Sequence, residues 1–373
     1  MAGLSDDTIA SITLYRQWQP FRDGTYTCSG GRSAEGFDST IVAIETRDGA
    51  RGYGETAPLG AFYDPAFAEG ARAAMRELAP RLIGGRASGI EALYRRMDLL
   101  LKGHGYAKAG IDMALWDLLG RRTGQSLAAM TGGADGTTIP LYRSVAQQAP
   151  DAMAARAAKY VAEGYRRLQV KVGLDVNDDI ARLEAVRTAI PSDIVLFCDA
   201  NASWGTAETR RFLMATRALD YTLEQPCASY DENLAIRRAT DRPLVLDETI
   251  DTVDILLRAM SDGLLDGVTI KLARVGGVSK ARLIRDIAAA RNLKITIEDT
   301  GGAQLDTAAY SALMLSTPEH LRQHTVDFHN WVTVSNGEAQ FDIADGVMAP
   351  GQGPGLGVEV DAGVFGEPVF RAE

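Results

Sequence analysis

The first third of the chain changes from strand-like runs to helical spacing. Three runs rich in β-branched and aromatic residues are bounded by glycine or charged turns, which predicts strands at Ile9–Tyr15, Thr25–Ser29 and Thr40–Thr46. Apolar residues then recur every three or four positions, which predicts helices at Ala66–Leu82, Ile90–Leu101 and Lys108–Arg122. The pattern indicates an α+β module over residues 1–130.

From residue 131 on, short apolar runs alternate with amphipathic segments at a spacing of about 23 to 30 residues, the length of one strand-plus-helix unit. The runs are apolar throughout, as strands buried on both faces are, and lie at Ile139–Ser144, Leu168–Val172, Val195–Asp199, Tyr221–Glu224, Leu244–Asp247, Gly267–Lys271, Ile295–Glu298 and about Thr325–Phe328. Eight such runs predict a parallel barrel over residues 131–345. We expect the Gly/Pro-rich tail, residues 346–373, to return to the first module.

Composition and charge narrow the class of protein. The chain has 373 residues, of which 46% are hydrophobic and 24% charged, so it can bury a large core. Its net charge of −10 argues against nucleic acid or an anionic membrane as partner. No apolar run reaches about 18 residues, and the start lacks a basic segment before an apolar one, so we expect neither membrane span nor signal peptide. Three cysteines without CxxC spacing favour the cytoplasm.

Charged and amide side chains lie at the carboxyl ends of successive predicted strands, where barrels of this kind carry their active sites. In chain order they are Gln169 and Lys171, Asp199 and Asn201, Glu224, Asp247 and Glu248, Lys271, and Glu298 and Asp299. Any one of them alone is typical of a solvated loop. Their occurrence at strand end after strand end predicts a shared site.

The three carboxylates Asp199, Glu224 and Asp247 would repel one another if they were buried together without a cation. Oxygen ligands without cysteine or histidine favour Mg²⁺ over Zn²⁺. The lysines Lys171 and Lys271 belong to the second and sixth strands, which lie roughly across a barrel from each other. A lysine near a cation has a lowered pKa and can act as a base. We therefore expect proton abstraction beside a metal-bound carboxylate.

Several motifs support this interpretation by resemblance. Gly52–Thr56 (GYGET) and Ala107–Gly120 (AKAGIDMALWDLLG) are similar to the specificity turn and the cap-to-barrel helix of the enolase superfamily. Lys271–Gly277 (KLARVGG) matches its K-x-x-R-x-G-G pattern. The resemblance covers nearly the whole chain and is to the muconate-lactonizing-enzyme subgroup, whose Mg²⁺ and lysine chemistry is a known pattern.

This resemblance implies a fold and a set of roles. The fold would be a modified TIM barrel, (β/α)7β, with an N-terminal α+β capping domain completed by the C-terminal tail. Asp199, Glu224 and Asp247 would bind Mg²⁺, and Lys171 and Lys271 would be the acid/base pair. The ligands and lysines would be oriented by neighbouring polar residues, Glu248, Asn201 and Gln169. The substrate would be a small carboxylate, and members often form homo-oligomers.

Two departures from the family patterns bear on the chemistry. Many members carry Lys-x-Lys on the second strand, whereas Gln169 occupies the first of these positions here. The seventh strand ends in Glu298 rather than histidine, which argues against the mandelate-racemase subgroup with its His–Asp base. We therefore expect structural or surface roles for the four histidines, His104, His320, His324 and His329.

Within the subgroup, the chain resembles hydroxyproline betaine epimerases and cis-3-hydroxy-L-proline dehydratases. The features that it shares with them are Arg167–Gly173 (RLQVKVG), the stretch EQPC that begins at Glu224, and Gly353–Gly357 (GPGLG). Asp327–Val334 (DFHNWVTV) resembles the dehydratases' eighth strand more than that of the epimerases. Gly301–Gln304 replaces the Trp-Gly-Gly-Asp stretch of both families, near the distal end of the substrate.

Substrate contacts are expected from the cap loops Gln17–Arg32 and Pro58–Pro65 and from the strand ends. Tyr63 aligns with a substrate-contacting tyrosine of the betaine epimerases. Aromatic side chains would attract a cationic amine, and two carboxylates could pair with it. The predicted substrate-binding residues are Tyr63, Trp204, Glu298, Asp299, Asp327, Phe328 and Trp331.

These residues leave several functions open. The first hypothesis is a racemase or epimerase of a proline-like or N-modified amino acid, because two lysines could serve opposite faces of the α-carbon. The alternative is a dehydratase of a cis-3-hydroxyproline-like amino acid, which begins with the same proton abstraction. A cycloisomerase or dipeptide epimerase is weaker, because no Asp-x-Asp pair follows the eighth strand. A binding protein without turnover would have no use for the lysines.

Overall fold

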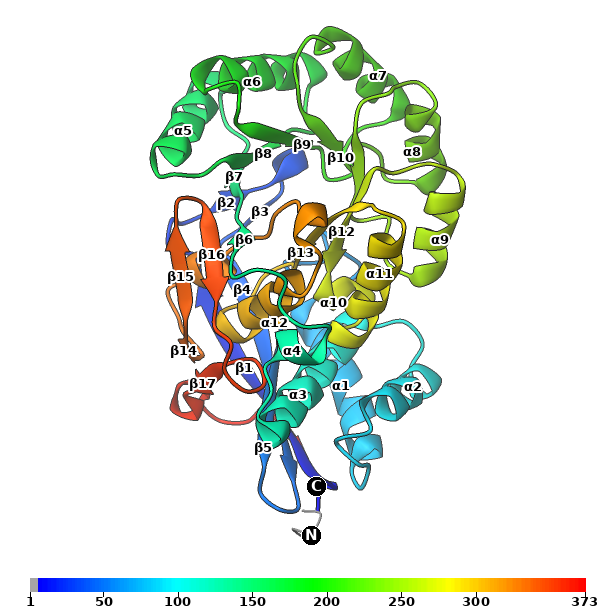
Figure 1. The fold of residues 1–373 in the computed structure, drawn as a ribbon, viewed down its shortest axis with the longest axis vertical. Coiled ribbons are helices and arrows are strands. Elements are labelled where there is room, and N and C mark those ends of the chain that lie inside the picture. Colours follow the sequence, from blue (N-terminus) through cyan, green and yellow to red (C-terminus); the bar gives the residue numbers. More distant parts are fainter. Residues whose placement is uncertain (1–5) are drawn as a thin grey trace.

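The computed structural model describes residues 6–373, so the first five residues of the predicted module lie outside the described residues. The N-terminal part contains an antiparallel sheet in the order β18-β1-β4-β5. Its strands are β1 (Ile9–Pro20), β4 (Gly36–Thr46), β5 (Arg51–Thr56) and β18 (Phe370–Ala372). Because β18 pairs with β1, the end of the chain completes the cap, as predicted. Figure 1 shows the cap strands and both chain ends at the lower end of the molecule.

Three helices follow, close to the predicted ranges: α1 (Ala68–Leu82), α2 (Ile90–Leu100) and α3 (Gly105–Thr123). Helices α1 and α3 pack on the sheet, and α2 packs on these two helices. The predicted turn motif GYGET explains how α3 reaches β5. A Cβ atom at Gly52 would lie 2.4 Å from the carbonyl oxygen of Ala114, and one at Gly54 would lie 2.1 Å from that of Gly110. The two glycines therefore let helix and strand meet at their backbones.

Seven parallel strands form the second part, in sequential order from β7 to β13. They are β7 (Arg143–Val145), β8 (Arg167–Lys171), β9 (Val195–Asp199), β10 (Thr222–Glu224), β11 (Leu244–Leu246), β12 (Gly267–Lys271) and β13 (Lys294–Glu298). The helices that follow them are α5 (Pro150–Ala162), α6 (Val176–Ala189), α7 (Thr206–Ala215), α8 (Tyr230–Arg237), α9 (Val253–Ser261), α10 (Leu272–Val275), α11 (Val278–Ala290) and α12 (Gln304–Leu315). Figure 1 shows these helices outside the curled sheet. The predicted barrel-and-cap fold class is confirmed.

Two strand predictions were wrong in detail. The first run splits, because β6 (Ile139–Pro140) pairs antiparallel with β16 (Val347–Pro350), and only β7 joins the parallel sheet. The eighth run, predicted at about Thr325–Phe328, is not a strand. Thr325 makes a single parallel bridge to Leu141 and donates its hydroxyl to the carbonyl of Ile297 at 2.6 Å. One residue therefore joins the first and seventh strand positions before the chain turns into η3 (Phe328–Asn330).

The remaining elements are short. They are β2 (Tyr26–Thr27), β3 (Ser33–Ala34), β14 (Gly337–Ala339), β15 (Phe341–Ala344), β17 (Val358–Val360), α4 (Leu127–Met130) and the 3-10 turns η1 (Ser29–Gly31), η2 (Glu319–Leu321) and η4 (Ala362–Phe365). The hairpin β15–β16 spans the predicted division at residue 345, so that division stays a prediction. Over residues 6–373, no helix has both the length and the apolar character needed to cross a bilayer.

Candidate active site

The parallel register brings the predicted strand-end residues together at one edge of the sheet. Lys171 on β8 pairs with Asp199 on β9, and Asp199 pairs in turn with Glu224 on β10. On the other side, Lys271 on β12 pairs with Glu298 on β13. Both lysines are 7% exposed, and Asp199, Glu224, Asp247 and Glu298 are each at most 2% exposed. The strand ends thus hold a buried, densely charged site.

On the β8 side, Lys171 is held by residues of the barrel. Its Nζ lies 2.5 Å from Oδ2 of Asp199 and 3.2 Å from Oδ1 of Asn201. The amide of Asn201 also donates to Glu248 at 3.0 Å, so Asn201 connects the lysine to a second carboxylate. Asn201 has a φ of 43°, a left-handed conformation that asparagine tolerates better than most residues. Burial, followed by the charge of Asp247, raises the pKa of Glu248 to about 8.

Glu224 lies between the two lysine strands and accepts two side-chain hydrogen bonds. Gln169 donates to it at 2.8 Å and Thr269 at 3.0 Å. Burial, and then the neighbouring charges of Asp199 and Asp247, raise the pKa of Glu224 well above its usual range. Sequence analysis did not single out Thr269. It precedes Lys271 by two residues, as Gln169 precedes Lys171, and this strand periodicity was the available signal.

On the β12 side, Lys271 contacts both barrel and cap. Its Nζ lies 2.9 Å from Oε1 of Glu298 and 3.4 Å from Oδ2 of Asp247. The Tyr63 ring from the cap loop lies 5.1 Å from the same nitrogen. The second carboxylate oxygen of Glu298 is buried and has no hydrogen-bond partner among the described residues. This oxygen remains able to accept a hydrogen bond from a ligand.

Among the three candidate metal ligands, Asp247 is hydrogen-bonded to a side chain of the cap loop. Tyr63 donates its hydroxyl to Asp247 at 2.9 Å, and Arg274 forms a hydrogen-bonded ion pair with it. Arg274 also pairs with Asp64 of the cap loop at 2.9 Å. Burial would raise the pKa of Asp247, but Arg274 and then Lys271 outweigh it, and the pKa is lowered. Arg274 was noted only as part of a motif, because its partner lies 27 residues away in the sequence.

The direct contacts with carboxylates raise the pKa values of both lysines, whereas a lowered lysine pKa was expected near a cation. Burial, the largest single effect, lowers the pKa of Lys171, but the neighbouring groups Asp199, Tyr26 and Glu224 together outweigh it, and the pKa is raised. The pKa of Lys271 is likewise raised, by Asp247 and Glu298 against the effect of burial. Within residues 6–373, no three acidic, histidine or cysteine side chains form a preassembled metal-ligand set. Asp199 and Asp247 are instead paired with the protein's own cations, and Glu224 is hydrogen-bonded to Gln169 and Thr269.

A cavity of about 40 Å³ lies between the two lysines. The predicted residues that line it are Gln169, Lys171, Asn201, Lys271, Glu298, Asp299, Tyr63, Phe328 and Trp331, and further lining residues are Phe21, Tyr26, Cys28, Phe37, Leu59, Tyr142 and Thr300. The sequence pattern does not predict this second set as a group. Phe21, Tyr26 and Cys28 do belong to the predicted cap loop Gln17–Arg32, and Leu59 to the cap loop Pro58–Pro65. The cavity combines two amines with a largely aromatic wall.

Two predicted substrate residues do not line this cavity. Trp204 is 3% exposed and packs on Phe212, with ring centroids 4.7 Å apart. Asp327 is fully buried and accepts hydrogen bonds from Asn330 at 3.0 Å and Arg143 at 3.4 Å. Asp299 does line the cavity, although two backbone amides already donate to its carboxylate, and burial raises its pKa to about 6.

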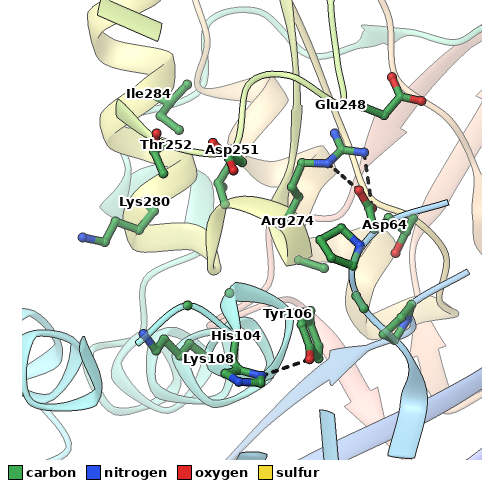
Figure 2. Close-up of a pocket in the computed structure, with 18 of the residues that line it drawn as sticks. Asp64, His104, Tyr106, Lys108, Glu248, Asp251, Thr252, Arg274, Lys280 and Ile284 are labelled. Carbon is green, nitrogen blue, oxygen red and sulfur yellow. Dashed lines mark hydrogen bonds and ion pairs between the residues drawn. The ribbon is translucent and has the colours of Figure 1, made fainter. Parts of the chain in front are cut away.

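A larger cavity of about 600 Å³ lies beside this site, along Arg274 (Figure 2). It is bordered by the cap loop at Asp64, the start of α3 at His104 and the segment at Asp251, with Glu248 at its edge. Neither lysine lines it. We place the reacting groups in the smaller cavity, because only there do both amines face one space.

Comparisons with known proteins agree with this arrangement. The family model described as enolase C-terminal domain-like matches residues 152–364, and the mandelate racemase/muconate lactonizing enzyme N-terminal domain matches residues 30–132. The chain is 43% identical over 363 residues to the cis-3-hydroxy-L-proline dehydratase of Roseibium aggregatum, which covers 97% of this chain and 99% of that protein. It is 31% identical over 279 residues to the N-succinyl-L-Arg/Lys racemase of Bacillus cereus, covering 73% and 74%.

Solved structures show the same relationship. A mandelate racemase/muconate lactonizing enzyme from Roseovarius nubinhibens ISM, crystallised with magnesium, superposes with a TM-score of 0.94 at 35% identity, covering 98% of this chain and 100% of that one. The relatives are a dehydratase, racemases and epimerases, so the chain is an enzyme of the isomerase or lyase type. The chain belongs to the mandelate racemase/muconate lactonizing enzyme group of the enolase superfamily.

Proposed function

We propose that the chain is a Mg²⁺-dependent dehydratase of cis-3-hydroxy-L-proline or a close analogue. The observation that carries the proposal is the pair of buried lysines, Lys171 and Lys271, which approach one small cavity from β8 and β12. The 43% identity to a cis-3-hydroxy-L-proline dehydratase, over nearly the full length of both chains, supports this substrate class.

Asp199, Glu224 and Asp247 would hold the Mg²⁺ ion. The donor set fits the metal, because three nearly fully buried carboxylates lie at the ends of adjacent strands, and burial and then the charges of the other two raise the pKa of Glu224. The bound ion would stabilise the negative charge that proton loss creates on the substrate carboxylate. Binding of the ion would require Asp247 to exchange its contact with Arg274, and Asp199 its contact with Lys171, for the metal. The second exchange would also remove a charge that raises the pKa of Lys171.

The two lysines would act on opposite faces of the substrate ring. In cis-3-hydroxy-L-proline the carboxylate and the 3-hydroxyl share one face, so the hydrogen on C2 and the hydroxyl lie on opposite faces. One lysine, as the neutral amine, takes the C2 proton. The other, as the ammonium, protonates the hydroxyl as the C3–O bond breaks. Water leaves, and the resulting enamine tautomerises to a cyclic imine, so that atoms and charge balance.

Glu298 and the aromatic wall would orient the ring. The free oxygen of Glu298 can accept a hydrogen bond from the protonated ring nitrogen, while its other oxygen holds Lys271. Phe328 and Trp331 pack edge to face, with centroids 5.2 Å apart, and give the pyrrolidine ring an apolar surface. These contacts would favour a free secondary amine over an N-acylated one.

Racemisation or epimerisation is the second candidate, because the same two lysines permit it. Without a leaving group on C3, the first lysine would take the C2 proton and the second would return one to the other face. The 31% identity to an N-succinyl-L-Arg/Lys racemase favours this candidate. Both reactions share the first step and differ in whether the substrate carries a leaving group.

The test is incubation of the purified protein with Mg²⁺ in D₂O and a panel of cis-3-hydroxy-L-proline, L-proline and N-methylproline. Loss of water with formation of the cyclic imine supports dehydration. Deuterium at C2 with inversion, without loss of water, supports epimerisation instead. The absence of both exchange and water loss across the panel would contradict the proposal and favour a binding protein. The cytoplasmic location and homo-oligomer stay predictions.

A further inference from the structure

A third cavity, of about 280 Å³, adjoins the reaction cavity on its outer side. It lies between the segment from Phe21 to Tyr26, the end of β7 and one face of α5. Figure 1 shows α5 and β7 at the same side of the barrel as the β2–β3 ribbon. Phe21, Tyr26 and Trp331 line both cavities. Only an aromatic partition therefore separates this outer cavity from the space between the lysines.

The outer cavity is cationic, although the chain as a whole is acidic. Arg22, Arg143, Arg156 and Lys159 line it, against the two acids Asp23 and Glu163. With a net charge of −10 for the chain, such a cluster runs against the general trend. A concave cationic surface concentrates anions near it.

The guanidinium groups of this cavity are only weakly neutralised by the protein. Arg22 donates to the backbone carbonyls of Asn330 and Val332, at 3.3 and 3.1 Å, rather than to a carboxylate. Arg156 makes no ion pair or hydrogen bond within residues 6–373. These two groups therefore keep donors that an anion can use.

Arg143 carries the strongest indication of a missing partner. Its Nε is buried and has no hydrogen-bond partner within residues 6–373. Its carboxylate contact is to Asp327, at 3.4 Å through Nη1. A buried donor without a partner costs free energy that a bound acceptor would recover.

Aromatic rings fix the orientation of these cations. The guanidinium carbon of Arg143 lies 4.9 Å from the centroid of Tyr165 and 5.8 Å from that of Tyr160, and that of Arg156 lies 6.0 Å from Tyr160. Stacking leaves the edges of a guanidinium free to donate hydrogen bonds. Planar forks of this kind match the two oxygens of a carboxylate.

We infer that the outer cavity is a carboxylate-binding subsite, in which an incoming substrate docks on the far side of Tyr26 and Trp331 from the reaction cavity. The identity of the ligand as substrate rests on the proposed function. Binding of a carboxylate does not, and can be measured without turnover.

Acetate is the probe, titrated against magnesium-free protein at constant ionic strength with chloride as the reference anion. Trp331 fluorescence reports binding, and Trp331→Phe checks that the signal comes from this residue. We expect a saturable change with acetate, and a rise in its Kd of about tenfold in Arg156→Gln, since hydrogen bonds to charged groups are the strong ones. Arg95→Gln, on the exposed face of α2, removes the same charge elsewhere and should leave the Kd unchanged.

The inference fails if acetate acts no differently from chloride, if Arg156→Gln binds acetate as the unmodified protein does, or if Arg95→Gln weakens binding equally. Turnover assays separate it from the proposed function. Arg156-dependent acetate binding without any reaction on the proline panel would keep the subsite and overturn the dehydratase. Turnover on the proline panel, together with acetate binding that does not depend on Arg156, would keep the dehydratase and overturn the subsite.

Discussion

Lys171 and Lys271 are equally buried, but the cap contacts the surroundings of each lysine differently. On the Lys171 side, the cap reaches backbone atoms, because Ser29 donates to the carbonyl of Asp199 at 3.0 Å. On the Lys271 side, it reaches charged side chains, because Tyr63 donates to the Asp247 carboxylate at 2.9 Å. The cap therefore contacts the backbone on the Lys171 side and a charged side chain of the site on the Lys271 side. Cap substitutions should accordingly affect the two halves of the site unequally.

Removal of each lysine should produce the largest effects and show which face each serves. Lys171→Ala and Lys271→Ala should each lower turnover by about 10²- to 10⁴-fold, the usual contribution of a positioned acid or base. The variant that lacks the base should also lose deuterium exchange at C2. The variant that lacks the acid should retain this exchange while losing dehydration. Mass spectrometry of the recovered substrate distinguishes the two.

Lys102→Ala is the matched control for both lysine variants, because Lys102 is an exposed lysine of the cap. It should react as the unmodified protein does. Full activity of Lys271→Ala in both reaction directions would show that this amine has no part in proton transfer.

A buried acid outside the site should contribute to the pH dependence of folding. Asp112 on α3 is fully buried and accepts hydrogen bonds from Ser279, and burial raises its pKa to about 7. Because the folded state favours the protonated acid, its stabilising contribution is complete below about pH 4 and is lost as pH rises to about 7. The loss is on the order of 4 kcal/mol at 1.36 kcal/mol per pKa unit.

Asp112→Asn should therefore flatten the free energy of unfolding between pH 4 and pH 7, measured by urea denaturation. This variant would sharpen the comparison of the lysines, because it separates the pH dependence of the fold from that of proton transfer. An unchanged slope would mean that Asp112 titrates normally.

The metal site should respond to the loss of one carboxylate charge. Glu224→Gln should weaken Mg²⁺ binding by more than about 100-fold, since even the groups that support metal ligands are worth about 10- to 100-fold. Calorimetric titration with Mg²⁺ measures this effect, and Glu77→Gln on the exposed face of α1 is the control. Equal Mg²⁺ affinity in both variants would remove Glu224 from the ligand set.

The sequence predicted the positions of the charged groups better than their surroundings. Lys171, Asp199, Glu224 and Lys271 each end a buried strand, and parallel strands end at one edge, so periodicity alone brings them together. Other residues around the cavity come from loops distant in the sequence, which periodicity does not reach. Tyr26, in the cap loop Gln17–Arg32, is such a residue, because only folding brings it to Trp331, 5.1 Å away.

Two of the misplaced predictions, Trp204 and the eighth strand, have the same physical origin. Trp204 follows a strand end as the site residues do, but its ring turns outward onto Phe212 of α7. The run at Thr325 is apolar enough for a strand, yet its side-chain hydroxyl bonds to the neighbouring strand and the chain turns directly afterwards. An apolar pattern predicts that a segment is buried. It does not predict whether a side chain points into the site or onto a neighbouring helix or strand.

The smallest effects test the comparison of the two lysine sides most directly. Tyr63→Phe removes a hydrogen bond to a carboxylate, and Ser29→Ala removes one to a neutral carbonyl. Bonds to charged groups contribute about 1.5–3 kcal/mol and neutral ones about 0.5–1.5 kcal/mol. Tyr63→Phe should therefore lower kcat by at least about tenfold, because it disturbs the charge beside Lys271.

Ser29→Ala should instead change kcat/KM by only a few fold, through looser closure of the cap, and should leave kcat nearly unchanged. Steady-state kinetics on the same substrate measure both variants. Equal losses of kcat would mean that the cap acts on both lysines in the same way, since a backbone contact and a contact to a reacting charge would then be indistinguishable. In that case the asymmetry between the two sides would be structural only, and the choice between base and acid would have to come from the substrate.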